Sequence, residues 1–240
     1  MNLGAIMSKI ILGDGLLGTE LHKITGWDYI SRKKDDIDFT DIDSYKHYIL
    51  DYYEVINCIA DCNTYSDDRS NHWNVNYKGV VDLVDCLNNE GMGEIKLIHV
   101  STDYVYSNSK LYASENDVPV HCENWYGYTK LLADAYVQLK MNDYLLVRGT
   151  HKATPFIHEE AYINQVGNFD YVDKVANIIK DLIDGEANGV YNVGTKLKTM
   201  YDLAKETNKS VIPVNKKFHS TMPSDVTINL DKLEEFYGKE

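Results

Sequence analysis

The sequence predicts an α/β protein with a doubly wound parallel sheet and a small, reduced C-terminal lobe. Short β-type runs alternate with helical patterns over the first two-thirds of the chain. A glycine-rich turn joins the first apolar run to the first helical pattern. The alternation loosens after residue 150. We therefore expect one domain over residues 1–150 and a reduced lobe over residues 151–240, packed on the same unit, with some elements returning to the sheet.

The predicted elements follow one another as β-α-β units. The strands are expected at residues 9–12, 28–31, 53–60, 94–101 and 143–148, and the helices at residues 16–25, 70–89 and 125–141. Beyond residue 150 we expect helices at 172–183, 200–207 and 231–237 and a strand at 189–193. In a parallel sheet of this kind, ligands bind at the carboxyl ends of the strands. The positions expected at those ends are Gly13–Gly18, Ala60, Ser101 and Arg148.

Composition narrows the class of protein. A chain of 240 residues with 44% hydrophobic content can bury the core of one large domain with a small appendage. The net charge of −13 argues against nucleic-acid binding, because no basic surface is available to neutralise phosphates.

No segment is apolar enough to span a membrane, and residues 1–6 do not resemble a signal peptide, so we expect a cytoplasmic protein. The four cysteines form no C-x-x-C pair, and we expect reduced thiols and no metal site.

The first motif is G-x-G-x-x-G, formed by Gly13, Gly15 and Gly18. The first glycine permits the tight turn, the second lets backbone approach a pyrophosphate, and the third lets the helix pack close to the strand. The amides and positive dipole of the helix N-terminus then face the anion. The segment Gly13-Asp14-Gly15-Leu16-Leu17-Gly18 is therefore expected to bind a dinucleotide in a Rossmann-like domain.

The second motif is Y-x-x-x-K, with Tyr126 and Lys130 on the predicted helix 125–141. Residues four apart share one helical face, so both side chains can point into one pocket. A nearby ammonium favours the phenolate and lowers the pKa of the tyrosine, which lets it exchange a proton with a carbonyl or an alcohol. Tyr128 lies two residues from Lys130 and faces elsewhere.

The third motif, Ser101-Thr102-Asp103-Tyr104-Val105-Tyr106, ends the strand that precedes this helix. A hydroxyl at that position can hydrogen-bond the substrate oxygen and orient the tyrosine. By itself, a residue such as Thr102 is more often a turn residue than a catalyst. The three motifs in this order form a specific set.

The end of the second predicted strand bears on the choice of cofactor. An acidic residue there would bind the ribose 2′-hydroxyl of NAD, whereas a nearby cation accommodates a 2′-phosphate. The strand end reads Ser31-Arg32-Lys33-Lys34, and the first acid is Asp35. We therefore favour NADP(H), with Ser31 and Arg32 as contacts. NAD(H) stays an alternative, because these cations could also be a solvated charge run.

Together these segments resemble the extended short-chain dehydrogenase/reductase family, in particular its dTDP-4-dehydrorhamnose reductase branch of nucleotide-sugar reductases. The resemblance spans nearly the whole chain. Besides the three motifs, it rests on residues 38–41, 55–60, 74–76, 170–173 and 223–233.

The resemblance implies roles for individual residues. Thr102, Tyr126 and Lys130 match the catalytic set, in which the tyrosine donates a proton, the threonine polarises the substrate oxygen and a hydride passes from nicotinamide to a C4 ketone. Tyr126 and Lys130 would also contact the cofactor, and Lys130 would reach the nicotinamide ribose. The matching positions beside the cofactor are the glycine loop, Asp38 and Phe39 flanking the adenine, Cys58, Ile59 and Ala60 along the ribose, and Asn76. The implied substrate is a nucleotide-linked 4-keto-6-deoxy sugar, and a homodimer is in keeping with the family.

Three departures from the family pattern concern the substrate more than the cofactor. The segment between Arg148 and Asp173 is short, Met222 stands where an arginine is typical, and the family's last helix is absent after Gly238. The site could be more open, take a smaller substrate or be completed by another subunit. Two alternatives to a reductase therefore remain: a nucleotide-sugar epimerase or dehydratase on the same fold, and a non-catalytic dinucleotide-binding regulatory subunit.

Overall fold

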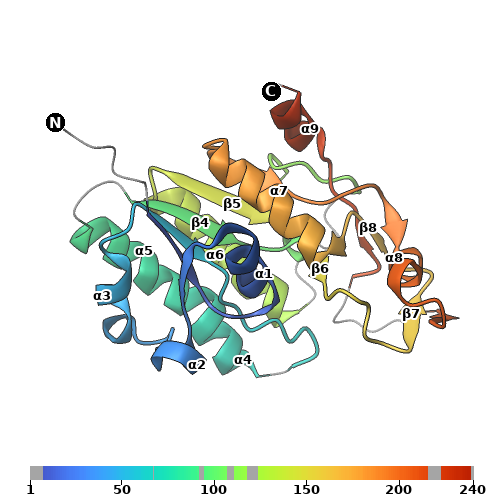
Figure 1. The fold of residues 1–240 in the computed structure, drawn as a ribbon, viewed down its shortest axis with the longest axis horizontal. Helices are drawn as coiled ribbons and strands as arrows, with labels where there is room; N and C mark the ends of the chain where they lie inside the picture. The colour runs from blue at the N-terminus through green and yellow to red at the C-terminus, as the bar shows by residue number, and fades with distance from the viewer. Residues whose placement is uncertain are drawn as a thin grey trace.

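The computed structural model describes residues 8–66, 68–91, 95–106, 111–117, 124–215 and 223–238. Its centre is a six-stranded, wholly parallel sheet in the order β2-β1-β3-β4-β5-β10 (Figure 1). The strands are β1 (Lys9–Leu12), β2 (Asp28–Ile30), β3 (Glu54–Asn57), β4 (Lys96–Val100), β5 (Tyr144–Arg148) and β10 (Gly189–Asn192). The predicted Rossmann-like α/β class is confirmed. The chain direction across the sheet reverses between β1 and β3, which is where such sheets bind ligands.

Alternating residues of the strands face two separate hydrophobic layers, as the period of two in a β-strand requires. Ile10 and Leu12 belong to the layer that packs against α5 (Gly79–Glu90) and α6 (Trp125–Lys140). Ile11 belongs to the opposite layer, under α1 (Leu16–Thr25) and α7 (Val172–Asp184). Because both faces are covered, the strands are buried on both sides and read as continuous apolar runs.

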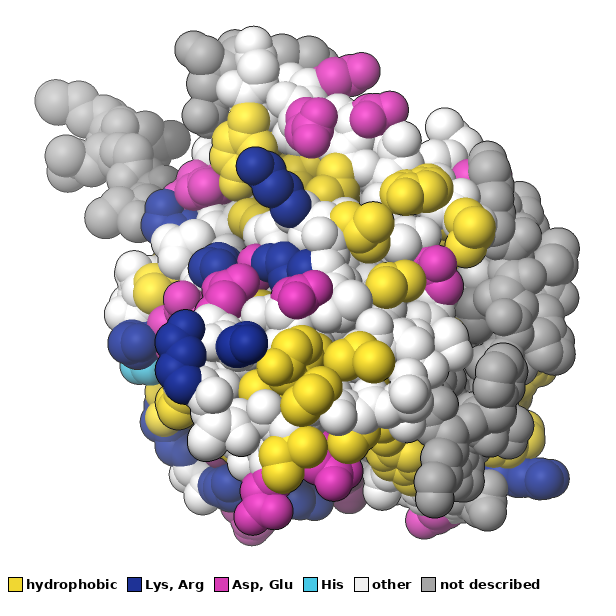
Figure 2. Space-filling view, turned by 90° about the vertical axis from the view of Figure 1, so that its right-hand side faces the viewer, with side chains coloured by type: hydrophobic (Ala, Val, Ile, Leu, Met, Phe, Trp, Pro, Cys, Tyr) yellow, Lys and Arg dark blue, Asp and Glu magenta, His cyan; other side chains and the backbone are white. Residues whose placement is uncertain are grey.

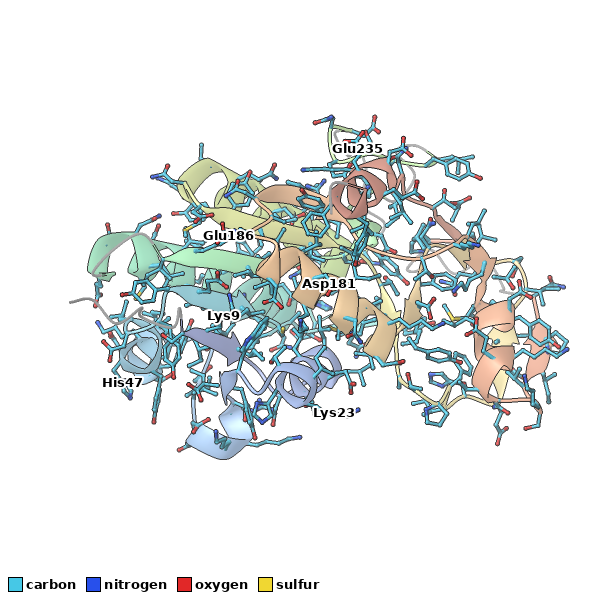
Figure 3. The ribbon with its side chains drawn as sticks, turned by 45° about the horizontal axis from the view of Figure 1, so that its top comes forward. Lys9, Lys23, His47, Asp181, Glu186 and Glu235 are labelled. Carbon is cyan, nitrogen blue, oxygen red and sulfur yellow. The ribbon has the colours of Figure 1, made fainter. Side chains whose placement is uncertain are left out.

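Helices α1 and α7 lie side by side over one face of the sheet (Figure 1). Lys23 on α1 and Asp181 on α7 mark this pair in Figure 3. On the other face, the predicted helix 70–89 is an almost unbroken helical run. It consists of α4 (Arg69–His72), a π-helical segment labelled η2 (Trp73–Lys78) and α5. The π-helical turn was not expected from the sequence.

The connection between β2 and β3 is made of short helices. These are α2 (Arg32–Asp35), η1 (Ile42–Ser44) and α3 (Lys46–Ile49). The predicted strand 53–60 ends earlier than expected, at Asn57. The Asn57 side-chain oxygen accepts a hydrogen bond from the Ile59 N–H at 3.0 Å, which turns the chain out of the strand. Residues 58–60 are thereby released to line the cleft above the sheet.

The C-terminal lobe is built from short elements. They are β6 (His151–Lys152), β7 (Glu160–Tyr162), β8 (Val166–Gly167), β9 (Asp170–Tyr171), β11 (Lys198–Thr199), α8 (Met200–Thr207), β12 (Ile212–Val214) and β13 (Asp225–Val226). The last helix, α9 (Asp231–Tyr237), packs instead on the sheet layer under α1 and α7. Phe156, Phe169, Met200 and Leu203 form a hydrophobic cluster of their own with Tyr104. Figure 2 shows the face that this lobe presents, with hydrophobic side chains among charged ones of both signs.

The described helices include none that is both long and apolar enough to cross a membrane. Strand β10, which lies beyond residue 150, belongs to the central sheet. The domain boundary expected at residue 150 stays a prediction.

Candidate active site

The turn between β1 and α1 has the geometry that the glycine motif predicts. Gly13 has φ = 101°, and its N–H donates to the Ile30 carbonyl at 2.8 Å. A Cβ on Gly18 would lie 2.1 Å from the Gly13 oxygen, so only glycine lets helix and turn approach this closely. A Cβ on Gly15 would meet nothing within 4 Å. The N-cap Gly15 provides no side-chain hydrogen bond, which leaves the first N–H groups of α1 open to an anion.

A cavity of about 370 Å³ lies over this turn at the carboxyl ends of β1 and β3. The predicted cofactor residues that line it are Gly13, Asp14, Gly15, Arg32, Asp38, Phe39, Cys58, Ile59 and Ala60. Residues far apart in the sequence are thus brought into one groove.

Ser31 is the predicted contact that the structure turns away from this cavity. Its side chain is buried, and its hydroxyl oxygen accepts the Lys34 N–H at 3.2 Å as the N-cap of α2. The carboxylate of Asp35 accepts the Ser31 N–H at 2.9 Å. The Asp35 carboxylate, the first acid after β2, is therefore engaged by a backbone N–H, whereas Arg32 is exposed and lines the cavity.

Phe39 and Asp38 have mainly structural contacts in the described protein. The Phe39 ring stacks on Tyr45 with centroids 5.6 Å apart and lies where a Cβ on Gly79 would come within 2.9 Å. The Asp38 carboxylate accepts from the Thr40 N–H at 2.9 Å and from the Thr40 hydroxyl at 2.8 Å. These bonds hold the pKa of Asp38 below its ordinary value. Both residues still present surface to the groove.

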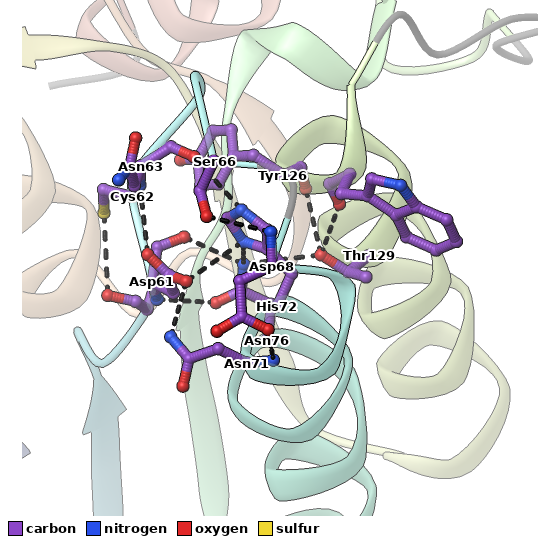
Figure 4. A network of polar contacts seen from close by, with 12 residues as sticks. Asp61, Cys62, Asn63, Ser66, Asp68, Asn71, His72, Asn76, Tyr126 and Thr129 are labelled. Atoms are coloured by element: carbon purple, nitrogen blue, oxygen red, sulfur yellow. Dashed lines mark hydrogen bonds and ion pairs between the residues drawn. The ribbon is translucent and has the colours of Figure 1, made fainter.

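Asn76 lies behind the cleft rather than on its lining. It is buried in the π-helical segment, where its Oδ1 accepts the Asp61 N–H at 2.7 Å and its Nδ2 donates to the Asp61 carbonyl at 2.9 Å. Figure 4 shows this contact among the polar network that also includes His72 and Thr129. Asn76 therefore positions the loop that carries Cys58–Cys62, and acts on the cleft through it.

The three predicted catalytic residues meet in a second cavity of about 310 Å³. Thr102, Tyr126 and Lys130 all line it, together with Leu16 and Leu17 from the start of α1. This cavity shares Gly15, Cys58 and Ala60 with the groove above the glycine turn. The two form one continuous cleft.

Tyr126 lies in the first turn of α6, whose N-cap Asn124 accepts the Gly127 N–H at 2.7 Å. The Tyr126 ring stands edge-on to that of Tyr104, with centroids 5.9 Å apart. Burial raises the pKa of Tyr126 well above its ordinary value, while a hydrogen bond with the Thr102 side chain acts in the opposite direction. The lowered pKa expected from the Lys130 ammonium is therefore not found, because burial dominates. The phenol holds its proton at neutral pH, which is the state needed to donate one.

Lys130 is fully buried, and its amine donates to the Val100 carbonyl at 2.7 Å. Its Nζ also lies 3.2 Å from His99 Nε2. Burial lowers the pKa of Lys130 and lowers that of His99 well below its usual range, so the imidazole is neutral. His99 and Val100 thereby fix the direction in which Lys130 enters the cleft.

Sequence reasoning missed several groups at this site. Asp103 is buried behind Thr102 and accepts hydrogen bonds from Thr150 and Thr102 at 2.7 and 3.3 Å. Its place inside the S-T-D-Y-V-Y motif was a signal that could have found it. Cys62 and Lys152 line the catalytic cavity as well, but no local pattern marks either residue.

A third cavity of about 640 Å³ adjoins the catalytic one and shares with it Cys62, Thr64, Tyr104 and Lys152. The shortened segment after Arg148 supplies much of its wall, including Phe156, His158–Ala161 and Tyr162. Met222, where the sequence departs from the family's arginine, lies outside the described residues.

The sequence matches the RmlD substrate binding domain family over residues 7–151. The chain belongs to this family. No curated protein matches it by sequence. Its fold places it among solved structures of similar architecture, which cover nearly all of it at low identity.

Three of these solved structures share the fold of this chain over almost its whole length. A hypothetical dTDP-4-dehydrorhamnose reductase from Sulfolobus tokodaii has a TM-score of 0.80 at 20% identity, with 95% of this chain and 94% of that one covered. The dTDP-4-dehydrorhamnose reductase from Bacillus anthracis, solved with NADP, has a TM-score of 0.77 at 20% identity, covering 98% and 100%. The Clostridium acetobutylicum reductase has a TM-score of 0.77 at 21% identity, covering 97% and 93%. At these identities the likeness establishes the shared fold.

Proposed function

We propose that the protein is an NADP(H)-dependent reductase of a nucleotide-linked 4-keto-6-deoxy sugar. The observation that carries this proposal is the continuous cleft, in which the groove over the glycine turn leads directly to Thr102, Tyr126 and Lys130. Family membership and the reductases of the same fold, one of them bound to NADP, support the choice of substrate class and cofactor. A purely regulatory subunit would not need all three side chains in one cavity.

The residues divide the chemistry between them. When bound, the reduced nicotinamide supplies a hydride to the C4 carbonyl carbon. Tyr126 gives its phenolic proton to the carbonyl oxygen as negative charge develops there, so that ketone, hydride and proton yield the alcohol. Thr102 hydrogen-bonds the same oxygen, for which its hydroxyl turns its one proton from Asp103 to the substrate, and holds that oxygen in line with Tyr126. Lys130, held by Val100 and His99, is placed to bind the nicotinamide ribose.

The test is NADPH oxidation against nucleotide-linked 4-keto-6-deoxyhexoses that carry dTDP, UDP, GDP or CDP. Tyr126→Phe should reduce kcat by about 100-fold or more, because general acid catalysis typically contributes that much. Its NADPH affinity, measured by fluorescence titration, should stay within about twofold of the wild type, since the groove over the glycine turn is untouched. Turnover that persists in Tyr126→Phe would overturn the assignment of the proton donor.

Arg32 is proposed to select NADP(H) over NAD(H). Arg32 lines the groove directly after the N-cap of α2. Asp35, the first acid after β2, is bound to the Ser31 N–H. Arg32→Ala should weaken NADPH binding by about tenfold, the equivalent of one charge-assisted hydrogen bond, and leave NADH binding unchanged. Lys33→Ala is the matched control, because Lys33 is exposed and does not line the groove. Equal effects on the two cofactors would contradict this role.

Two further parts of the proposal concern the setting of the protein. We place it in the cytoplasm, which follows from the sequence-based expectation alone. We also propose a homodimer, as the family resemblance implies. Sedimentation equilibrium tests the second point, and a mass of one chain at micromolar concentration would contradict it.

A further inference from the structure

Lys152 is a cation of the cleft to which the mechanism gives no task. It lies in β6, just beyond the carboxyl end of β5, and it lines both the catalytic cavity and the adjoining cavity of about 640 Å³. It therefore stands at the junction between the reacting groups and the space left for the rest of a substrate.

The Lys152 ammonium makes no hydrogen bond or ion pair with the described residues. Burial lowers its pKa, while the charge of Asp103 acts in the opposite direction without forming an ion pair. Lys152 is half-buried, and an ammonium partly removed from water without a partner is unfavourable. The arrangement would be relieved by an anionic group entering the cleft.

The other cations near the sheet edge are already engaged. Lys130 donates to Val100 and faces His99, and Arg148 is bound to Asp134 at 3.0 Å. Among the described residues that line the two cavities, Lys152 is thus the cation left for a ligand.

The remaining walls indicate what kind of molecule brings the anion. Four aromatic side chains face the larger cavity: Tyr65, Tyr104, Phe156 and Tyr162. Such a lining suits a ring stacked against it rather than a free inorganic ion. Glu159 and Glu160 are exposed on this lining and would repel an anion near them. The anionic group therefore belongs at the inner end, beside Lys152.

We propose that Lys152 is a specificity-determining residue that binds an oxyanion of the substrate close to the reacting carbonyl. This inference rests on the proposed function, because it takes Tyr126 and Thr102 as the place where the carbonyl lies. The oxyanion is a phosphate of the nucleotide carrier, because a 6-deoxy sugar carries no carboxylate at C6. A carboxylate on the sugar is the second possible source, and finding it would mean that the substrate is not a 6-deoxy sugar. The two sources share one recognition chemistry, a charge-assisted hydrogen bond from the ammonium.

Calorimetric titration of the NADP⁺-loaded protein distinguishes the two sources without requiring turnover. One arm compares dTDP with thymidine, and the other compares UDP-glucuronate with UDP-glucose. Lys152→Met should weaken the anionic member of one pair by about tenfold or more and leave the neutral or less charged member within about twofold. The pair that responds identifies the source.

Two further variants test whether a loss of affinity comes from the missing charge at position 152. Lys152→Arg keeps the cation and should restore most of the affinity. Lys209→Met removes an exposed lysine that does not line either cavity, and should leave all four affinities unchanged. Unchanged NADP⁺ affinity and unchanged circular dichroism of Lys152→Met establish that the variant is folded.

The inference is overturned if Lys152→Met weakens both members of each pair equally, weakens none, or if the wild-type protein binds none of the four ligands. It can fail separately from the reductase proposal. Tyr126-dependent turnover with unaltered anion affinity in Lys152→Met defeats only the role of Lys152. Lys152-dependent binding without NADPH oxidation defeats only the reductase.

Discussion

Asp103 shows how a single buried carboxylate shapes this site. One of its oxygens accepts hydrogen bonds from Thr150 and Thr102, and the other, Oδ2, is buried and has no partner among the described residues. Burial raises the pKa of Asp103 to about 6. The residue thus anchors Thr102 while carrying a charge that its surroundings solvate poorly.

This pKa predicts how stability depends on pH. Because the folded pKa lies above the usual value of 3.8, the folded protein binds the proton more tightly than the unfolded chain. Stability from this group is therefore present below pH 4 and lost as pH rises through 6. The loss amounts to about 3 kcal/mol at most, from the size of the shift. Asp103→Asn keeps an acceptor for Thr150 and should remove this loss.

The measurement is the free energy of unfolding in urea at pH 4.5 and at pH 7.5, for wild type and Asp103→Asn. Other titrating groups cancel in the difference between the two proteins. The variant should gain stability relative to wild type at the higher pH. A difference that is independent of pH would show that Asp103 is not titrating in this range.

At the scale of elements, two glycines of the β1–α1 turn have different roles, one in folding and one in cofactor binding. A Cβ on Gly18 would collide with the Gly13 carbonyl, whereas a Cβ on Gly15 would enter open space. Gly18→Ala should therefore destabilise the protein, by about 2 kcal/mol or more, as expected for forced overpacking. Gly15→Ala should keep wild-type stability and lose cofactor affinity, because its methyl group would occupy the place of the pyrophosphate.

Thermal unfolding without cofactor and NADPH titration check these two expectations together. If Gly15→Ala unfolds as early as Gly18→Ala, the space around Gly15 is not open in solution. If it binds NADPH as tightly as wild type, the pyrophosphate lies elsewhere.

The elements with a strong local signal could be predicted closely from the sequence. Strand β1 and helices α1, α8 and α9 have the predicted bounds, because apolar periodicity and glycines mark their ends. The predicted strand 53–60 was too long, since Cys58, Ile59 and Ala60 continue the apolar pattern after the side chain of Asn57 has turned the chain.

Other features depend on contacts that no local pattern records. The π-helical turn has the same side-chain types as an α-helix, so the sequence does not distinguish the two. Its role is recognised from the hydrogen bonds between Asn76 and Asp61. The short strands of the C-terminal lobe pair across long stretches of chain. At the site, the motifs predicted that Thr102 and Tyr126 meet in one cavity. The position of Lys152 in the cleft is set by tertiary contacts alone, whereas the S-T-D-Y-V-Y motif already places Asp103 beside Thr102.

At the scale of the whole molecule, one buried network joins the sheet to the C-terminal segment. Arg148 at the end of β5 donates to Asp134 on α6 at 3.0 Å and to the Tyr106 hydroxyl at 2.6 Å. Tyr106 donates to Asn192 on β10 at 3.0 Å, and Asn192 donates to the Asn229 carbonyl at 3.1 Å. Arg148 lies at the carboxyl end of β5, as expected, and its side chain points into this network.

Because the network is buried, removing one charge of the pair should lower the free energy of unfolding more than removing both. Arg148→Met leaves the Asp134 carboxylate unpaired and should lower the free energy of unfolding by about 3–5 kcal/mol. Adding Asp134→Leu removes the stranded charge, so the double variant should recover a large part of that loss. Urea unfolding of the wild type, both single variants and the double variant gives the coupling energy between the two positions. Additive losses would mean that Arg148 and Asp134 do not stabilise each other in the folded protein, and that β5 and α6 are joined by apolar packing.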